Sequence, residues 1–268
     1  MTRLKKLAII ASLLLVVGVV GSLLTYKSMI KAEDVFEEKE LDAENITDIQ
    51  VNVDHAKVDI VPMQATDKIT VELTGKVAKY KKYKLEAKTE GNSAIIKLNE
   101  RQRKLFSMNF FNESFYLKIG VPEKEYDTIA VEVVNGLIQA SGLHVKSGTV
   151  RTVNGKIDLK DIQSSSMETR SENGAIHMNE VTGELKGRVT NGNISLLSNN
   201  LERSIDFAST NGQIRIETDH EPNNVSFDVS VTNGDAEIFG RTAKDVKFGN
   251  GEHLIKLKTI NGKVNVNE

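Results

Sequence analysis

Few residues of this chain have a type and spacing that could carry out chemistry. Asp158 and Asp161 are the nearest pair of carboxylates that could act together in glycoside hydrolysis. Five histidines are scattered along the sequence, and one of them, His177, stands between two apolar residues as in an alternating strand. With no cysteine, the chain has neither a cysteine nucleophile nor a Cys-ligated zinc site. Because a polar outer strand face explains these acids and histidines equally well, we predict no enzyme activity, no catalytic residue, no metal site and no cofactor.

A basic and aromatic segment at residues 76–116 is the strongest signal for binding. It holds ten Lys and Arg against four Glu, and four of the nine phenylalanines. This mixture suits anionic lipid headgroups, an anionic wall polymer or an acidic envelope protein. The candidate patch consists of Lys79, Lys81, Lys82, Lys84, Arg101, Arg103, Lys104, Phe110 and Phe111. Two alternatives stay open, because the phenylalanines could fill a core and nearby acids could neutralise the lysines.

The first 32 residues differ from the rest of the chain. Leu7 to Leu24 is an uncharged run that would span about 27 Å as a helix, enough to cross a bilayer core. Because Arg3, Lys5 and Lys6 precede it, we predict a cytoplasmic tail at 1–6, a transmembrane anchor at 7–26 and an extracytoplasmic remainder. A cleaved signal peptide is the alternative. The expected location is the cell membrane, with a single span.

Charge and pattern divide the remainder into a linker and a domain. The whole chain carries a formal charge of -2, which gives no reason to expect nucleic acid as a partner. Residues 27–46 are rich in Asp and Glu and are predicted to form an acidic linker. From 47 to 268 the sequence alternates apolar and polar residues, as in Lys57-Val58-Asp59-Ile60, so we predict an all-β domain interrupted by an irregular insertion at 76–116.

An internal repeat gives the architecture. Asn-Gly pairs recur at intervals of 18 to 28 residues, and each is followed by alternation in the same phase. The predicted corner residues are Asn135, Asn154, Asn173, Asn191, Asn211, Asn233 and Asn261. A period near 19 favours a β-solenoid of short stacked coils over an antiparallel sandwich, which remains the competitor. A weaker copy at 54–60 and the last, longer interval predict an early start and a final coil that caps the stack.

The repeats carry a resemblance to a known family. Thr152-Val153-Asn154-Gly155 and Val231-Thr232-Asn233-Gly234, following a membrane anchor, resemble the bacterial "putative adhesin" domain of unknown function found in LiaG-like and YvlB-like envelope stress proteins of Gram-positive bacteria. The resemblance covers residues 47–268. It implies a β-solenoid and an envelope location, and it brings no catalytic motif.

The expected function is therefore that of a non-enzymatic, membrane-tethered envelope protein. Its solenoid would bind a partner protein, anionic lipid or wall polymer, in envelope stress or adhesion. The alternative is a β-helix that binds or cleaves a polysaccharide. Such a protein needs clustered carboxylates or aromatic residues along the stacked coils, and no uniform stripe appears among the outward residues that follow the Asn-Gly corners.

Overall fold

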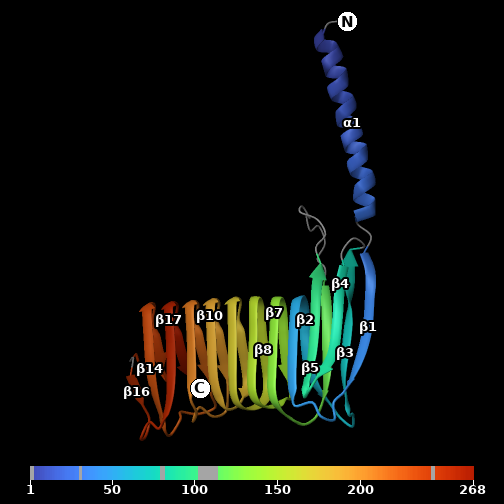
Figure 1. The fold of residues 1–268 in the computed structure, drawn as a ribbon. Helices are drawn as coiled ribbons and strands as arrows, with labels where there is room; N and C mark the ends of the chain where they lie inside the picture. Colours follow the sequence, from blue (N-terminus) through green and yellow to red (C-terminus); the bar gives the residue numbers. More distant parts are fainter. Residues whose placement is uncertain (1–2, 30–31, 79–81, 102–113, 243–244) are drawn as a thin grey trace.

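The computed structural model describes residues 3–29, 32–78, 82–101, 114–242 and 245–268. One helix, α1 (Arg3–Met29), stands away from a long stack of strands (Figure 1). Its described apolar side chains are exposed, and Leu14 and Leu15 each keep 68% of their surface free. Within the described residues, no helix has both the length and the apolar character that a membrane crossing needs.

The strands of the middle coils follow one another in chain order. They are β7 (Glu125–Ser141), β8 (His144–Asn173), β9 (Ile176–Val181), β10 (Glu184–Asn191), β11 (Ile194–Leu197), β12 (Ile205–Asn211) and β13 (Ile214–Glu217). β7 and β8 run without a break through the corners at Asn135 and Asn154, whereas each later middle coil enters its Asn-Gly corner on one strand and leaves it on the next. We call the strand segments before the corner the first layer and those after it the second layer.

Successive middle coils pair in parallel and in register. Asn173 lies beside Asn191, and Asn191 lies beside Asn211. Because side chains alternate along a strand, this register stacks like on like, and the inward isoleucines of the second layer form a fully buried row. That row comprises Ile157, Ile176, Ile194 and Ile214. The parallel pairing agrees with the predicted stack of coils and excludes the antiparallel sandwich for this part of the chain.

At the N-terminal end, neighbouring strands are not always consecutive in the chain. The strands here are β1 (Ala32–Asp42), β2 (Asp48–Met63), β3 (Lys68–Ala78), β4 (Lys82–Glu90), β5 (Ser93–Arg101) and β6 (Ser114–Pro122). β2 pairs in parallel with β7, so the weaker repeat copy is a true coil of the stack. Beyond it, β5 and β4 extend the first layer, while β6, β3 and β1 extend the second.

Two expectations about this end need correction. Residues 32–42 were assigned by composition to an acidic linker, but they form β1, which pairs with β3 along its whole length. Its acids are those of an edge strand, where charge opposes pairing with other chains. In the described part of 76–116, the predicted irregular insertion is also largely strand, because it contains the end of β3, all of β4 and β5, and the start of β6.

The C-terminal end holds another departure from chain order. Its strands are β14 (Val225–Asn233), β15 (Ala236–Ile238), β16 (Asp245–Lys247), β17 (His253–Asn261) and β18 (Val264–Asn267). β17 pairs with β12 on one side and β14 on the other, and β18 lies likewise between β13 and β15. The last coil is therefore inserted within the stack, and the prediction that it caps the edge is wrong.

The cap at this end is formed by the preceding coil. β16 pairs antiparallel with β14, and the rings of Phe227, Phe239 and Phe248 pack edge to face with centroids 5.5 to 6.3 Å apart. Arg241 lies over the Phe248 ring. Large rings cover more of an exposed apolar edge than aliphatic side chains do, which explains why three of them gather here.

Candidate binding surface

The corner asparagines form one continuous row along an edge of the stack. Six of the seven side-chain amides donate to the side-chain oxygen of the asparagine in an adjacent coil, over 2.7 to 2.9 Å. In spatial order the row runs Asn135, Asn154, Asn173, Asn191, Asn211, Asn261 and Asn233. At the N-terminal end Asn135 Nδ2 lies 2.8 Å from His55 Nε2, so a histidine of β2 takes the place of an asparagine.

The corner glycines allow the coils to approach. At Gly192, φ is +148°, and a Cβ there would lie 1.9 Å from the carbonyl oxygen of Gly174 in the adjacent coil. Only glycine combines this φ with so close a backbone contact. Below, the "corner edge" means the edge that carries these Asn-Gly corners, and the "turn edge" means the opposite edge, where each coil turns into the next.

The structure describes part of the predicted basic patch. Lys82 and Lys84 are exposed at the start of β4, and Lys84 pairs with Glu86 on the same strand. Arg101 ends β5, directly opposite Lys82. The remaining members lie outside the described residues; they are Lys79, Lys81, Arg103, Lys104, Phe110 and Phe111.

An aromatic pair beside these lysines belongs to the core. Phe115 is 3% exposed, and its ring centroid lies 5.1 Å from that of Tyr83. Burial raises the pKa of Tyr83, and its hydrogen bond to Glu37 of β1 raises it further. Phe115 therefore fills the core, which was one of the two alternatives for the phenylalanines of this segment. The described acids of β1 meet this tyrosine and lysines of β3, as in the Lys76–Asp34 pair at 3.7 Å.

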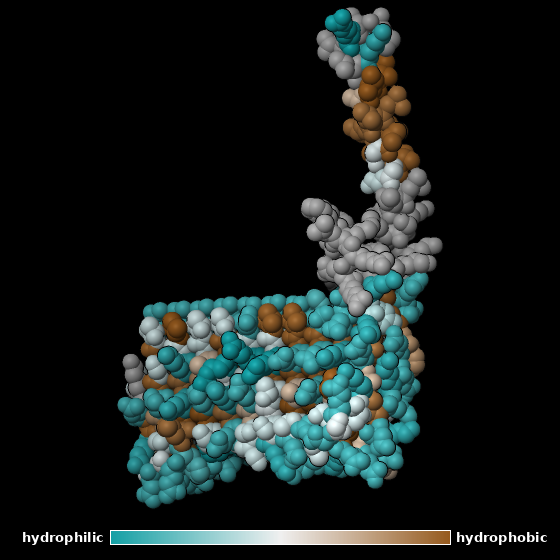
Figure 2. All heavy atoms as spheres, in the orientation of Figure 1, coloured by the Kyte–Doolittle hydropathy of each residue, from teal (hydrophilic) through white to brown (hydrophobic). Residues whose placement is uncertain are grey.

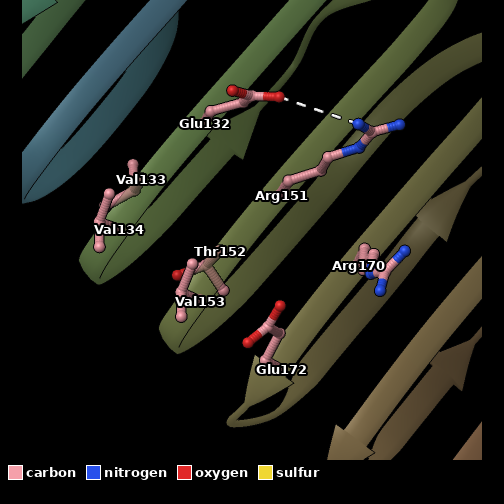
Figure 3. A pocket seen from close by; sticks show the side chains of 8 residues that line it. All are labelled: Glu132, Val133, Val134, Arg151, Thr152, Val153, Arg170 and Glu172. Atoms are coloured by element: carbon pink, nitrogen blue, oxygen red, sulfur yellow. Dashed lines mark ion pairs between the residues drawn. The ribbon is translucent and has the colours of Figure 1, made fainter.

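A shallow hollow of about 250 Å³ lies on the first layer below the corner edge (Figure 3). It spans three adjacent coils, and an ion pair between Arg151 and Glu132, 3.9 Å apart, crosses part of it. Arg170, in the next coil, makes no ion pair within the described residues. Thr152 borders the hollow, and its buried hydroxyl lacks a hydrogen-bond partner in the same part of the chain. The hollow offers charge and some apolar surface rather than a closed cavity.

The outward row of the second layer brings together three residues that the sequence leaves 18 to 19 positions apart. Asp158, His177 and Ser195 occupy adjacent strands, and Ser195 Oγ lies 2.6 Å from His177 Nδ1. Burial lowers the pKa of His177, and nearby Lys156 lowers it further. In the sequence, the apolar and polar residues alternate in the same phase after each corner, which places these three residues at equivalent positions. Only the register between the paired strands shows that they are neighbours.

This row has the residue types of a nucleophile site without its surroundings. The residues belong to the interior of a parallel sheet, where backbone N–H groups bond the neighbouring strands and cannot stabilise an oxyanion. The predicted carboxylate pair is separated as well. Asp158 lies 3.0 Å from Lys156, whereas Asp161, at a point of β8 where φ is +51°, lies 3.7 Å from Lys160. No group of three or more His, Cys, Asp or Glu in the described chain could hold a metal ion.

Comparison with known proteins assigns the repeats. The family described as Toastrack DUF4097 matches residues 46–165 and 136–267. A structure titled "putative adhesin" from Bacteroides fragilis NCTC 9343 is similar at 12% identity and a TM-score of 0.47, covering 87% of this chain and 97% of the other. A "putative cell adhesion protein" from Clostridium sporogenes ATCC 15579 gives 10% identity and a TM-score of 0.35, covering 88% and 99%. The search of curated proteins gave no match.

Proposed function

Because the chain belongs to the Toastrack DUF4097 family, we propose that it is a non-enzymatic binding protein of the bacterial cell envelope, tethered to the membrane by its N-terminal segment. The cytoplasmic tail would be residues 1–6 and the membrane segment residues 7–26. The stack of coils outside would bind an anionic surface or an acidic envelope protein.

One observation carries this proposal: the anchor and the basic segment leave the stack at the same edge. Ala32, at the start of β1, pairs with Ala78, at the end of β3. Two residues earlier in β3, Lys76 pairs with Ser114, the first residue of β6. Ser114 lies at the same height along the strands as the corner row of asparagines. Lys82 and Arg101 end the first layer at this edge too. A membrane that holds α1 would therefore face this edge of the stack and lie next to the basic residues.

The anchor itself is supported by the sequence and by exposed apolar side chains. The uncharged run from Leu7 to Leu24 is preceded by three basic residues, and the described part of α1 leaves its apolar side chains uncovered. Such side chains are stable in lipid and unfavourable in water. Figure 2 shows this apolar stretch well separated from the strands.

The experiment removes four lysines from the patch and asks whether binding to anionic membranes or wall polymer is lost. The variant changes Lys79, Lys81, Lys82 and Lys84 to Gln. Full-length protein in neutral vesicles should bind soluble teichoic acid at low salt, and the variant should bind at least tenfold more weakly. Binding should also fall between low and physiological salt, because the Debye length shortens from about 30 to 8 Å.

A matched control removes the same charge elsewhere. It changes four lysines toward the turn edge to Gln: Lys68, Lys88, Lys146 and Lys160. If the control loses as much binding as the patch variant, net charge alone is responsible and the patch has no role. Carbonate extraction of the parent protein tests the anchor separately, because release into the soluble fraction would contradict tethering. Deletion of the whole segment is unsuitable, since it would remove β4 and β5.

A further inference from the structure

We infer that the corner edge of the whole stack lies along the anionic surface of the membrane that holds the chain, with the turn edge facing away. This inference rests on the proposed membrane anchor. It adds a second contact surface, distinct from the patch at residues 79–104, and it commits to anionic lipid headgroups as the partner.

The first step is the position of the anchor relative to the coils. In the second layer, Lys76 of β3 and Ser114 of β6 lie at the level of the corner row, and β1 starts two residues beyond that level. α1 thus joins the stack at the corner edge, as Figure 1 shows. A membrane reached by this helix is nearer to the corner edge than to the turn edge.

The second step is a difference in charge between the two edges. Around the seven corners, from three residues before each Asn to the residue after each Gly, six basic side chains stand against three acidic ones. The basic residues are Arg151, Lys156, Arg170, Arg188, Lys258 and Lys263. Two of them, Arg170 and Lys258, form no ion pair within the part of the chain that the structure describes.

Three successive turns of the turn edge have the opposite character. The three turns at 179–184, 197–204 and 217–224 contain six acidic residues and a single basic one, Arg203. The acids are Glu180, Glu184, Glu202, Glu217, Asp219 and Glu221. An anionic membrane therefore repels these three turns and attracts the corner edge, and the attraction extends over a Debye length of about 8 Å at physiological salt.

The third step is the apolar surface beside the corner row. Val134, Val153 and Ile260, each directly before a corner Asn, are exposed although they are large and aliphatic. Figure 2 shows apolar side chains directly below the hydrophilic row on the upper edge. Interspersed basic and apolar side chains are the composition that favours the headgroup region.

The test measures the distance of each edge from the membrane in the full chain. The protein has no cysteine, so a single label site can be introduced at Thr190→Cys on the corner edge or at His220→Cys on the turn edge. After reconstitution into vesicles with phosphatidylglycerol, an impermeant dye is attached, and energy transfer to a headgroup-labelled lipid is recorded. We expect at least twofold greater transfer from position 190, and loss of the difference in phosphatidylcholine or at 1 M salt.

Two charge variants complete the test. Arg170→Gln, Lys258→Gln and Lys263→Gln together should abolish the difference between the two labels. The control, Lys146→Gln, Lys160→Gln and Lys247→Gln, should keep it, and thermal melting verifies that both variants are folded. Equal transfer from both positions in the parent would overturn the inference while leaving the anchor intact. Protein that does not float with the vesicles would instead overturn the proposed function.

Discussion

The middle coils and the two ends of the stack use the same repeat in different ways. From β7 to β13, each coil packs on the next coil in the chain, and every corner Asn bonds the Asn of an adjacent coil. At the ends, the partners are remote in sequence: His55 meets Asn135 across 80 residues, and the last coil lies between two earlier ones. Local repetition therefore specifies the middle, and long-range pairing specifies the ends.

Aromatic residues follow the same division. The middle coils from β7 to β13 bury two aromatic side chains, Tyr126 and Phe207, whereas Phe115 packs with Tyr83 toward one end and three phenylalanines close the other. A middle coil is covered on both sides by coils of equal size, so aliphatic rows fill most of its interior. An end coil has one uncovered side, and a large ring shields more of that side per residue.

The largest expected effect breaks the close approach of the middle coils. Gly192→Val would place a Cβ 1.9 Å from a backbone oxygen at a φ that valine avoids, so we expect a loss of more than about 4 kcal/mol or failure to fold. The control is Gly91→Ala in the end hairpin β4–β5, where φ is +62° but no atom lies within 4 Å of a Cβ. It should cost about 1 kcal/mol. Urea unfolding compares the two, and similar losses would mean that φ alone matters.

The next effect tests the inserted coil. Leu257→Ala in β17 removes a buried side chain and should cost about 2 to 5 kcal/mol. Because β17 supports β14 as well as β12, hydrogen exchange should accelerate in residues 225–233, which precede the mutation in the chain. Leu185→Ala in β10 is the matched change in a middle coil. If it accelerates exchange in β14 as much as Leu257→Ala does, the ends unfold together with the middle.

The sequence predicted the middle coils because their information is local. Corner Asn-Gly pairs and alternating isoleucines recur at nearly constant spacing, and parallel stacking follows from that period. The insertion of β17 could not be predicted, because its alternation and its Asn-Gly corner are the same as those of the other coils and do not specify a position in the stack. Likewise, among the β1 residues whose burial is described, only Val35 and Leu41 are buried or partly buried apolar residues, so the composition of the strand resembles that of a linker.

The candidate site was predictable to a smaller extent. The corner asparagines were identified from spacing, since each stands at the same point of its repeat. The division of charge between corner edge and turn edge was not, because it depends on which residues of different coils share an edge. The neighbours Asp158, His177 and Ser195 required the register for the same reason.

A smaller effect compares two members of the asparagine row. Asn191 both donates to Asn173 and accepts from Asn211, whereas Asn233, at the end of the row, donates to Asn261. Asn191→Ala should therefore cost about 1 kcal/mol or slightly more, and Asn233→Ala less, because one hydrogen bond contributes about 1 kcal/mol. Thermal and urea unfolding give both values. A larger loss at Asn233 would indicate that the end of the row, not its middle, limits stability.

The smallest effect uses pH to examine a middle coil. Burial and then Lys156 lower the pKa of His177 in the folded protein, although Asp158 opposes them. Below the unfolded value of about 6.5, the unfolded chain then binds more protons than the folded one, so stability should fall as pH decreases from 6.5 toward the folded pKa. Well above pH 6.5 the histidine is neutral in both states and makes no pH-dependent contribution. His177→Gln should reduce the loss of urea midpoint between pH 7 and pH 5 relative to the parent. If the variant and the parent lose the same amount, the acid sensitivity of the stack arises outside this coil, and the row of His177 and Ser195 is only a polar surface.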